Sequence, residues 1–314
     1  MLERMLMGEE TSSLPDTSLS GAAAIMMMPA EEAEEVEALR RHEASIVVVD
    51  YHKGNLSSVY RAIADVGTST VVTSDNPDEI RDAAGIVLPG VGSFYDAITF
   101  MAENGEAEAV RAAIAAGTPF LGICLGQQLL FERGDEGVPK DVPCLQAVDT
   151  AGSNLQPGDV FEAEGKRWVR GLGILKGSCT RLDGSRLKVP HVGWDQVHPT
   201  GTGAASPLLD GFPEGANMYF THSYVVEGAD PSDVIARTHY VDSFPCMVGR
   251  GNVFGCQFHP EKSSGRGRDI LRRFVSIVRR EYGADNVDPV ILAAAHKRLD
   301  AAAAASQCKG VFRS

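Results

Sequence analysis

The sequence lacks several features that define whole classes of protein. No apolar run reaches the roughly 18 residues that cross a bilayer, so no membrane span is expected. The six cysteines form no Cys-x-x-Cys pair and show no zinc-type spacing, so we expect reduced thiols in a cytoplasmic protein, with neither metal nor cofactor. Positive charge is scarce: the net charge is -13, which argues against nucleic acid or an anionic membrane as the main partner.

The 314 residues suffice for one large domain, and changes in pattern divide the chain into three parts. Residues 1–44 contain a Ser/Thr/Pro-rich stretch at Thr11–Ser20 and an excess of acidic residues, and are interpreted as a largely disordered N-terminal extension. Residues 45–282 carry the patterns of a globular domain, interrupted at about 133–170 by a Gly-, Asp- and Pro-rich insertion or surface excursion. Residues 283–314 are predicted to be a C-terminal extension with an Ala-rich helix.

Strand and helix patterns alternate in the first half of the globular part. Four β-branched or apolar runs predict strands, at Ile46–Asp50, Thr70–Thr73, Gly85–Leu88 and Phe120–Cys124. One helix with an exposed Glu-rich face is expected between Phe94 and about Ala116. The second half is antiparallel in character, with one long strand pattern at Met218–Val226 and a final amphipathic helix at Asp269–Tyr282. This order predicts an α/β fold: a three-layer, mostly parallel open sheet with helices on both faces and an antiparallel extension.

The segment Gly122-Ile-Cys124-Leu-Gly126 joins the fourth strand to a helical pattern. Small residues two places on either side of a nucleophile permit a sharp strand-to-helix turn that exposes the middle side chain, as in the G-x-S-x-G elbow of hydrolases. Backbone N–H groups at the start of a helix favour a thiolate beside them. Cys124 is therefore a candidate nucleophile, although a buried structural cysteine has the same local appearance.

A thiol nucleophile needs a base and a group that orients the base. His259 follows an apolar strand pattern, Pro260 turns the chain, and Glu261 is close enough to accept a hydrogen bond from the imidazole. Among the other histidines only His222, within Thr-His-Ser-Tyr, has a comparable setting. The His-Pro-Glu tripeptide alone is equally compatible with a loop histidine beside a surface glutamate.

Acyl chemistry also needs donors for a developing oxyanion. The N–H of Leu125, directly after the candidate nucleophile, is one candidate. Pro89-Gly90-Val91-Gly92 offers another, because its glycines let a peptide plane reorient so that the Val91 N–H faces the site. A plain Gly-rich turn remains open as an alternative. Phosphate binding is disfavoured because the Lys-Ser/Thr of a P-loop is absent.

Taken together, three segments resemble the class I (triad-type) glutamine amidotransferases. They are Pro89-Gly-Val-Gly-Ser-Phe94, Gly122-Ile-Cys-Leu-Gly-Gln-Gln128 and Gln257-Phe-His-Pro-Glu261. The resemblance implies hydrolysis of L-glutamine to glutamate and ammonia through a thioester on Cys124, with His259 as base and then acid, and Glu261 orienting it. It also implies a set of residues that hold glutamine or shape its pocket: Gly90, Gly92, Gln128, Ser223 and Tyr224.

Within that family, further segments are similar to the glutaminase subunits of imidazole glycerol phosphate synthases. They are Asp50–Val59, Gly171–Leu175, Lys188–Asp195 and Tyr219–Tyr224, and the likeness covers about Ser45 to Arg280. It implies a heterodimer with a (β/α)8 cyclase subunit that makes imidazole glycerol phosphate and AICAR in histidine biosynthesis. Trp194 and Asp195 would then lie near the shared interface, with Asp195 standing where the family commonly has Asn.

Three other interpretations remain open from the sequence. The chain could be the amidotransferase subunit of another pathway, such as the anthranilate or pyridoxal phosphate type, which the Asp50–Val59 opening disfavours. It could be a non-enzymatic scaffold that kept the fold, or a stand-alone cysteine hydrolase. The candidate triad disfavours the scaffold.

Overall fold

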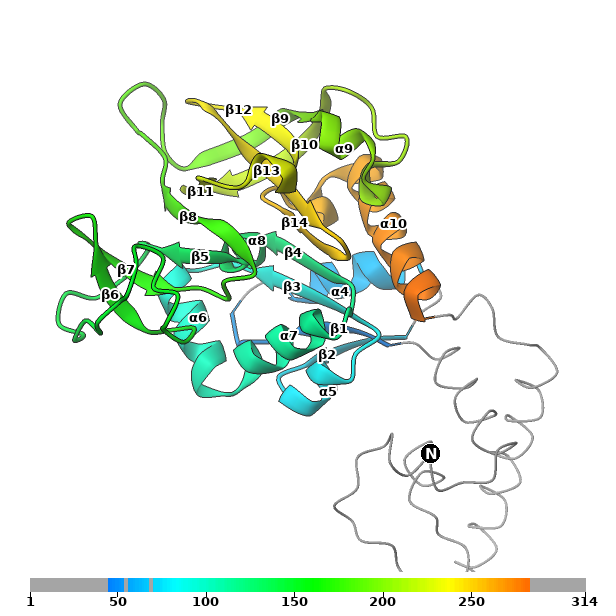
Figure 1. The fold of residues 1–314 in the computed structure, drawn as a ribbon. Coiled ribbons are helices and arrows are strands. Elements are labelled where there is room, and N and C mark those ends of the chain that lie inside the picture. The colour runs from blue at the N-terminus through cyan, green and yellow to red at the C-terminus, as the bar shows by residue number, and fades with distance from the viewer. Residues whose placement is uncertain (1–44, 54–55, 68–69, 283–314) are drawn as a thin grey trace, which may run out of the picture. The chain divides into compact units, whose positions relative to one another are not determined.

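A nine-stranded sheet in the order β10-β9-β12-β13-β14-β4-β3-β1-β2 organises the chain (Figure 1). The computed structural model describes residues 45–53, 56–67 and 70–282; the predicted extensions 1–44 and 283–314 lie outside these ranges. The strands are β1 (Ser45–Val49), β2 (Thr70–Ser74), β3 (Gly85–Gly90), β4 (Phe120–Cys124), β9 (His191–Pro199), β10 (Ala216–His222), β12 (Val234–His239), β13 (Ser243–Arg250) and β14 (Val253–Cys256).

The two halves of this sheet differ in direction, as the sequence predicts. Strands β2, β1, β3, β4 and β14 pair in parallel. The run from β14 through β13, β12 and β9 to β10 is antiparallel. The prediction of a three-layer α/β fold with an antiparallel extension is therefore confirmed.

A second sheet of five strands, in the order β11-β8-β5-β7-β6, was not expected from the sequence. Its members are β5 (Phe131–Gly134), β6 (Val160–Ala163), β7 (Lys166–Arg170), β8 (Leu175–Arg181) and β11 (Tyr224–Glu227). The Gly-, Asp- and Pro-rich segment 133–170 contributes β6, β7 and the end of β5. Trp168 of β7 is buried, and the guanidinium of Arg133 lies 4.2 Å from its ring centroid, so this segment carries packed structure of its own.

Helices cover both faces of the parallel strands (Figure 1). They are α4 (Leu56–Ala64), α5 (Pro77–Arg81), α6 (Phe94–Glu103), α7 (Glu106–Ala115), α8 (Leu125–Leu129), α9 (Gly201–Ala204) and α10 (Ser264–Tyr282), with short 3₁₀ turns η1 (Pro207–Leu209), η2 (Pro231–Asp233) and η3 (Pro260–Lys262). Successive side chains of a strand point to opposite faces of the sheet, so the core has two parts. On one face, Val47 and Val49 of β1 pack with α5, α6 and α7. On the other face the Val278 side chain of α10 lies directly against Gly85.

Two expected elements are divided by tertiary structure. The single helix expected between Phe94 and Ala116 is two helices, α6 and α7, separated at Gly105, which has φ +78°. The single strand expected at Met218–Val226 is β10 and β11, which lie in different sheets and are separated at Ser223. The last helix begins at Ser264, five residues before its apolar pattern.

The expected exposed Glu-rich helix face is wrong at Glu106. This side chain is fully buried at the start of α7, and neither carboxylate oxygen has a hydrogen-bond partner in the described residues. Burial raises the pKa of Glu106 to about 8, and the carboxylates of Asp75 and Asp50 act in the same direction. Glu108, two positions further on, is exposed as expected.

We expect Glu106→Leu to stabilise the protein at alkaline pH. The folded-state pKa of Glu106 lies above its unfolded value, so the stability that goes with the protonated carboxyl is complete below about pH 4.5 and is lost as the pH rises towards 8. An apolar side chain of similar size has no ionisation cost. The free energy of unfolding should therefore increase by roughly 2–4 kcal/mol at pH 8 and by much less at pH 5. Urea unfolding at both pH values measures the difference, with Glu108→Leu as the control; equal effects of Glu106→Leu at the two pH values would contradict the expectation.

Candidate active site

Cys124 stands at the junction between β4 and α8, in the strained backbone that an elbow requires. Its φ and ψ are 56° and -107°, a backbone conformation that residues other than glycine rarely adopt. Both flanking glycines are sterically necessary: a Cβ on Gly122 would lie 2.4 Å from the Gly126 carbonyl oxygen, and one on Gly126 would lie 1.8 Å from that of Leu88. The thiol is 7% exposed. The helix that follows is shorter than its pattern indicates, because the chain enters β5 at Phe131.

His259 and Glu261 meet just beyond the end of β14, the strand next to β4. The parallel pairing of these strands brings their carboxyl ends to one edge, so Cys124 and His259 come together although they are distant in sequence. The Nδ1 atom of His259 lies 2.8 Å from Oε1 of Glu261, and both side chains are almost fully buried. A carboxylate accepts a hydrogen bond from Nδ1–H, which leaves Nε2 as the proton-accepting atom.

The ring of His259 interacts with Cys124 as well as with Glu261. Burial by itself would lower the pKa of His259, but hydrogen bonding and charge interaction with Cys124 and Glu261 outweigh it and raise the pKa to about 9. Nε2 is nevertheless buried without a hydrogen bond of normal geometry in the described residues. The imidazole and the thiol therefore interact without forming a hydrogen bond of normal geometry in the described residues.

Two glutamines connect the thiol to the second sheet. The side-chain amide of Gln257 donates to the sulfur of Cys124 at 3.5 Å. The amide nitrogen of Gln128 donates both to Oε1 of Gln257 and to the carbonyl oxygen of Tyr224, each at 3.0 Å. Gln128, expected from the sequence to hold glutamine, is thus 3% exposed and bonded internally. Sequence reasoning missed Gln257 as a site residue, although it stands two positions before His259.

The Pro89–Gly92 segment lies beside the elbow, but the Val91 N–H is occupied. It donates to the hydroxyl of Tyr51 at 3.1 Å, across 40 residues of sequence. Gly90 pairs in register with Cys124, and a Cβ there would lie 2.7 Å from both the Cβ of Leu125 and the Tyr51 hydroxyl. Leu125 itself is the first residue of α8, where N–H groups have no helical partner. Burial raises the pKa of Tyr51, so its hydroxyl stays protonated.

The remaining predicted pocket residues come from both halves of the fold: Gly92 follows the parallel strand β3, and Ser223 and Tyr224 follow the antiparallel strand β10. Gly92 is exposed and has φ +104°, a conformation that favours glycine. Ser223 and Tyr224 are partly exposed where β10 passes into β11, and the neighbouring Thr221 carbonyl oxygen lies 3.9 Å from the sulfur of Cys124. The residues singled out from the sequence for catalysis and glutamine binding therefore gather around one edge of the sheet.

Ser263 ties the His259 turn to β10, a role with no signal in the sequence. Its hydroxyl donates to the His259 carbonyl oxygen at 2.7 Å and accepts from the Tyr219 N–H at 3.0 Å. The His259 N–H in turn donates to the Tyr219 carbonyl oxygen at 2.9 Å. These bonds fix the base relative to the strand that carries Thr221. Only the pairing of distant segments reveals them.

Trp194 and Asp195, predicted to face a partner, lie on β9 near one edge of the large sheet. Trp194 is 50% exposed and packs edge-on against Tyr219 of β10, with ring centroids 5.9 Å apart. Val192 on the same face of β9 is 56% exposed. The Asp195 carboxylate turns partly inward and lies 2.7 Å from Nε2 of His191. An exposed aromatic and aliphatic pair of this kind is typical of protein-binding surfaces.

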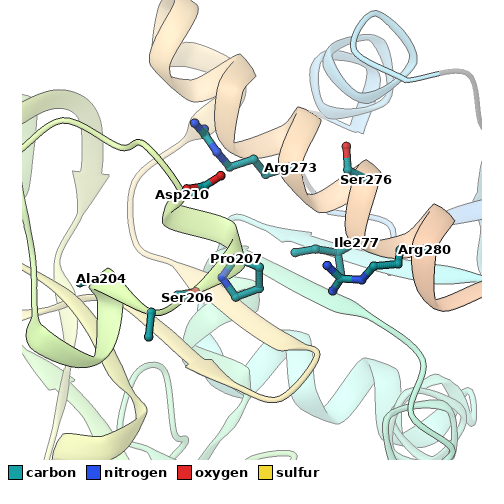
Figure 2. Close-up of a pocket in the computed structure, with 9 residues that line it drawn as sticks. Ala204, Ser206, Pro207, Asp210, Arg273, Ser276, Ile277 and Arg280 are labelled. Carbon is teal, nitrogen blue, oxygen red and sulfur yellow. The ribbon is translucent and has the colours of Figure 1, made fainter.

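Two open pockets lie away from Cys124. One, of about 480 Å³, is lined by residues of α9, η1 and α10, including Asp210, Arg273 and Arg280 (Figure 2). The other, of about 540 Å³, lies between Trp194 and the start of α10. Neither pocket is lined by a member of the candidate triad.

Three further observations concern the residues that the structure describes. The five cysteines among them are free thiols, as expected. None of the helices in those residues has the length and apolar character of a membrane span. Within the same ranges, His, Cys, Asp and Glu side chains form no group of three or more that could hold a metal ion.

The amino-acid sequence matches a known protein family and several of its named members. The family model "Glutamine amidotransferase class-I" matches residues 47–278. The chain is 41% identical over 244 residues to "Imidazole glycerol phosphate synthase subunit HisH" of Geobacillus thermodenitrificans, covering 76% of this chain and 99% of that protein. It is 42% identical over 236 residues to the protein of the same name from Symbiobacterium thermophilum, covering 75% and 95%.

Solved structures support the fold alone, because their sequence identities are low. A crystal structure described as a glutamine amidotransferase matches with a TM-score of 0.51 at 18% identity, covering 74% of this chain and 98% of that one. A protein from Thermoplasma acidophilum, described as a component of a GMP synthase, matches with a TM-score of 0.50 at 19% identity, covering 79% and 99%.

Proposed function

Because this chain belongs to the family of class I glutamine amidotransferases, we propose that it is the glutaminase subunit of an imidazole glycerol phosphate synthase. Relatives of that name align with it at about 41% identity over nearly their whole length. The observation that carries the chemistry is the arrangement of Cys124, His259 and Glu261 at one sheet edge. The protein hydrolyses L-glutamine to glutamate and ammonia, and the ammonia serves a synthase of histidine biosynthesis in the cytoplasm.

The proposed reaction begins with proton transfer from Cys124 to Nε2 of His259. The sulfur then attacks the side-chain carboxamide carbon of glutamine, and a C–S bond forms as the carbonyl becomes a tetrahedral oxyanion. His259 returns its proton to the nitrogen, the C–N bond breaks, and ammonia leaves. Water, deprotonated by His259, hydrolyses the thioester to glutamate and restores the thiol. Glu261 holds the ring with Nε2 towards the sulfur throughout.

The oxyanion requires hydrogen-bond donors, and we propose two backbone N–H groups. The Leu125 N–H at the start of α8 is the first. The Val91 N–H, bonded to Tyr51, must be released by rotation of the Gly90–Val91 peptide before it can be the second. Gly90, Gly92, Gln128, Ser223 and Tyr224 are proposed to line the glutamine pocket. Since Cys124 is 7% exposed and the Val91 donor is occupied, the isolated subunit is expected to be slow.

The partner is proposed to be a (β/α)8 cyclase subunit that forms a heterodimer through the face of β9 around Trp194. The relatives' printed name describes a subunit, which implies a second protein. Exposed Val192 and Trp194 give this face an apolar centre, and Asp195, the next residue along β9, turns its carboxylate to the opposite face. Tyr219 links the face to the active site, because it packs on Trp194 and bonds the His259 backbone.

We expect the cyclase to accelerate glutamine hydrolysis by roughly tenfold or more. Docking at Trp194 would shift Tyr219, which packs on Trp194 and bonds the His259 backbone, and so would adjust the imidazole relative to the thiol. Glutamate release is measured with and without the cyclase subunit of the same organism. An unrelated (β/α)8 protein at the same concentration is the control. Identical rates in all three samples would refute the assignment to this synthase.

A further inference from the structure

A chain of three hydrogen bonds runs through the interior from Asp195 towards the active site. Oδ2 of Asp195 lies 2.7 Å from Nε2 of His191. Nδ1 of His191 lies 3.1 Å from Nε2 of His222. Nδ1 of His222 lies 3.0 Å from the carbonyl oxygen of Tyr224. His191 is 1% and His222 7% exposed, so water does not easily replace the contact between the two imidazoles.

Counting protons along this chain shows that two neutral imidazoles cannot satisfy it. A carbonyl oxygen only accepts, so Nδ1 of His222 must carry a proton. If His222 is neutral, its Nε2 accepts and Nδ1 of His191 must donate. A neutral His191 then has no proton left on Nε2, which would present a lone pair to a carboxylate oxygen at 2.7 Å. The chain therefore needs a third proton, held between His191 and Asp195.

The surroundings favour that location for the third proton. Burial lowers the pKa of His222 to about 3, with the charges of His191 and His259 in the same direction, so His222 stays neutral. Burial also lowers the pKa of His191, whereas its hydrogen bond and charge interaction with Asp195 act in the opposite direction.

The other rings around His191 offer no proton acceptor. Its ring stacks between Tyr240, with centroids 4.0 Å apart, and Phe220, 4.9 Å away, and Phe244 approaches edge-on. The Tyr240 hydroxyl donates to the Lys188 carbonyl oxygen. Asp195 and His222 are therefore the titratable groups that hydrogen-bond to His191 in the described residues, and His222 faces His191 and His259.

Both ends of the chain lie at functional positions. Asp195 is 35% exposed and directly follows Trp194 on β9, with its side chain on the opposite face of the strand from the Trp194 ring. At the other end, His222 stands between Thr221, whose carbonyl oxygen is 3.9 Å from the Cys124 sulfur, and Ser223 of the proposed glutamine pocket. Tyr224, whose carbonyl oxygen ends the chain, is also bonded there by Gln128.

We propose that Asp195, His191 and His222 form a proton-dependent relay that holds segment 221–224 in place for glutamine and joins it to β9, the strand that carries Trp194. With the third proton bound, all three hydrogen bonds exist and the segment is fixed. When that proton leaves, one contact of the chain has no proton: a lone pair of His191 faces either the Asp195 carboxylate or Nε2 of His222, and the segment loosens. These are positioning residues, and this role in glutamine binding rests on the proposed glutaminase function.

The direction of the pH effect follows from the lowered pKa of His191. Because the pKa of His191 lies below its usual 6.5, the third proton is present only at acidic pH, so the KM for glutamine of the native protein should increase by roughly three- to tenfold between about pH 5 and 7. Asp195→Asn supplies a permanent amide N–H to His191, and its KM should stay low at both pH values. Asp195→Ala supplies none, and its KM should stay high at both.

The kinetic test measures kcat and KM of the full chain with saturating cyclase across this pH range. Glu214→Gln is the matched control: it removes an exposed carboxylate bonded to His198 on the neighbouring stretch of β9, and its curve should follow the native one. A structural role for Asp195 without a proton would give parallel KM curves for native protein, Asp195→Asn and Asp195→Ala. That result would overturn the relay.

A spectroscopic test is independent of glutaminase activity. The full chain is labelled with ¹⁵N-histidine, and the ring nitrogens are followed by NMR from about pH 5 to 9. We expect Nε2 of His191 to bind a proton at the acidic end in the native protein and to remain unprotonated at every pH in Asp195→Asn. If His191 and His222 together carry two protons at all pH values and Asp195→Asn changes neither ring, the relay is wrong. Failure of glutamine hydrolysis with this NMR result intact would instead remove the proposed function.

Discussion

Replacing Cys124 by serine is expected to lower kcat for glutamine hydrolysis by at least about 10³-fold. A hydroxyl is far less acidic than a thiol, so the imidazole of His259 cannot hold it as the anion that attacks the carboxamide. The paired His259, whose pKa is raised to about 9 with Cys124 as a partner, is suited to a thiolate–imidazolium pair. The fold should not change, because the substitution replaces one small side-chain atom in a turn formed by flanking glycines.

Glutamate release in the presence of the cyclase measures this effect, and circular dichroism checks the fold. Cys144→Ser is the matched control, since Cys144 is an exposed free thiol outside the elbow and the candidate triad, and its activity should equal that of the native protein. Cyclase supplied with ammonia in place of glutamine should work equally well with Cys124→Ser. Glutaminase activity that survives in Cys124→Ser would show that another group is the nucleophile.

The second large effect is expected from Gly126→Ala. A methyl group at this position would lie 1.8 Å from the carbonyl oxygen of Leu88, a backbone atom of β3 that cannot move without disturbing the central parallel strands. Overpacking against backbone in a closed core should lower the free energy of unfolding by about 3 kcal/mol or more. Any displacement of α8 also moves Leu125 and the thiol, so the surviving folded protein should be a poor glutaminase.

The measurement is urea unfolding followed by circular dichroism, together with glutamate release per folded molecule. Gly201→Ala serves as the control, because a Cβ on Gly201 has no atom within 4 Å and φ there is not positive. A stability of Gly126→Ala within about 0.5 kcal/mol of the native value, the range of ordinary surface substitutions, would show that the elbow has room for a methyl group.

The candidate triad was predictable because its signals are short in sequence. The contact between His259 and Glu261 spans two positions, and the elbow around Cys124 is encoded by glycines that flank it at two positions each. The parallel half of the sheet was predictable for a related reason, since β-branched runs separated by helix patterns leave few topologies. These local patterns do not determine which strands lie next to each other in the sheets.

Interactions that depend on strand neighbours were therefore missed. Gln257 contacts the sulfur of Cys124 across 133 residues, and Tyr51 occupies the Val91 N–H across 40. The burial of Glu106 was missed for a similar reason. Its position in an Ala- and Glu-rich helix indicated exposure, whereas the turn at Gly105 directs it into the core. A single sequence contains the residues of such contacts but not their pairing.

By itself, the sequence determined the chemistry that this protein can perform and the family to which it belongs. The reason is that a nucleophile elbow and a His-Pro-Glu turn are local structures, whose geometry follows from the few residues that form them. Only the tertiary structure decided the state of that chemistry. It shows the Val91 donor held by Tyr51, Nε2 of His259 buried without a hydrogen-bond partner among the described residues, and Asp195 bonded to His191. Each of these depends on which distant segments the sheets bring side by side, and burial then sets the cost of every unpaired proton and charge between them.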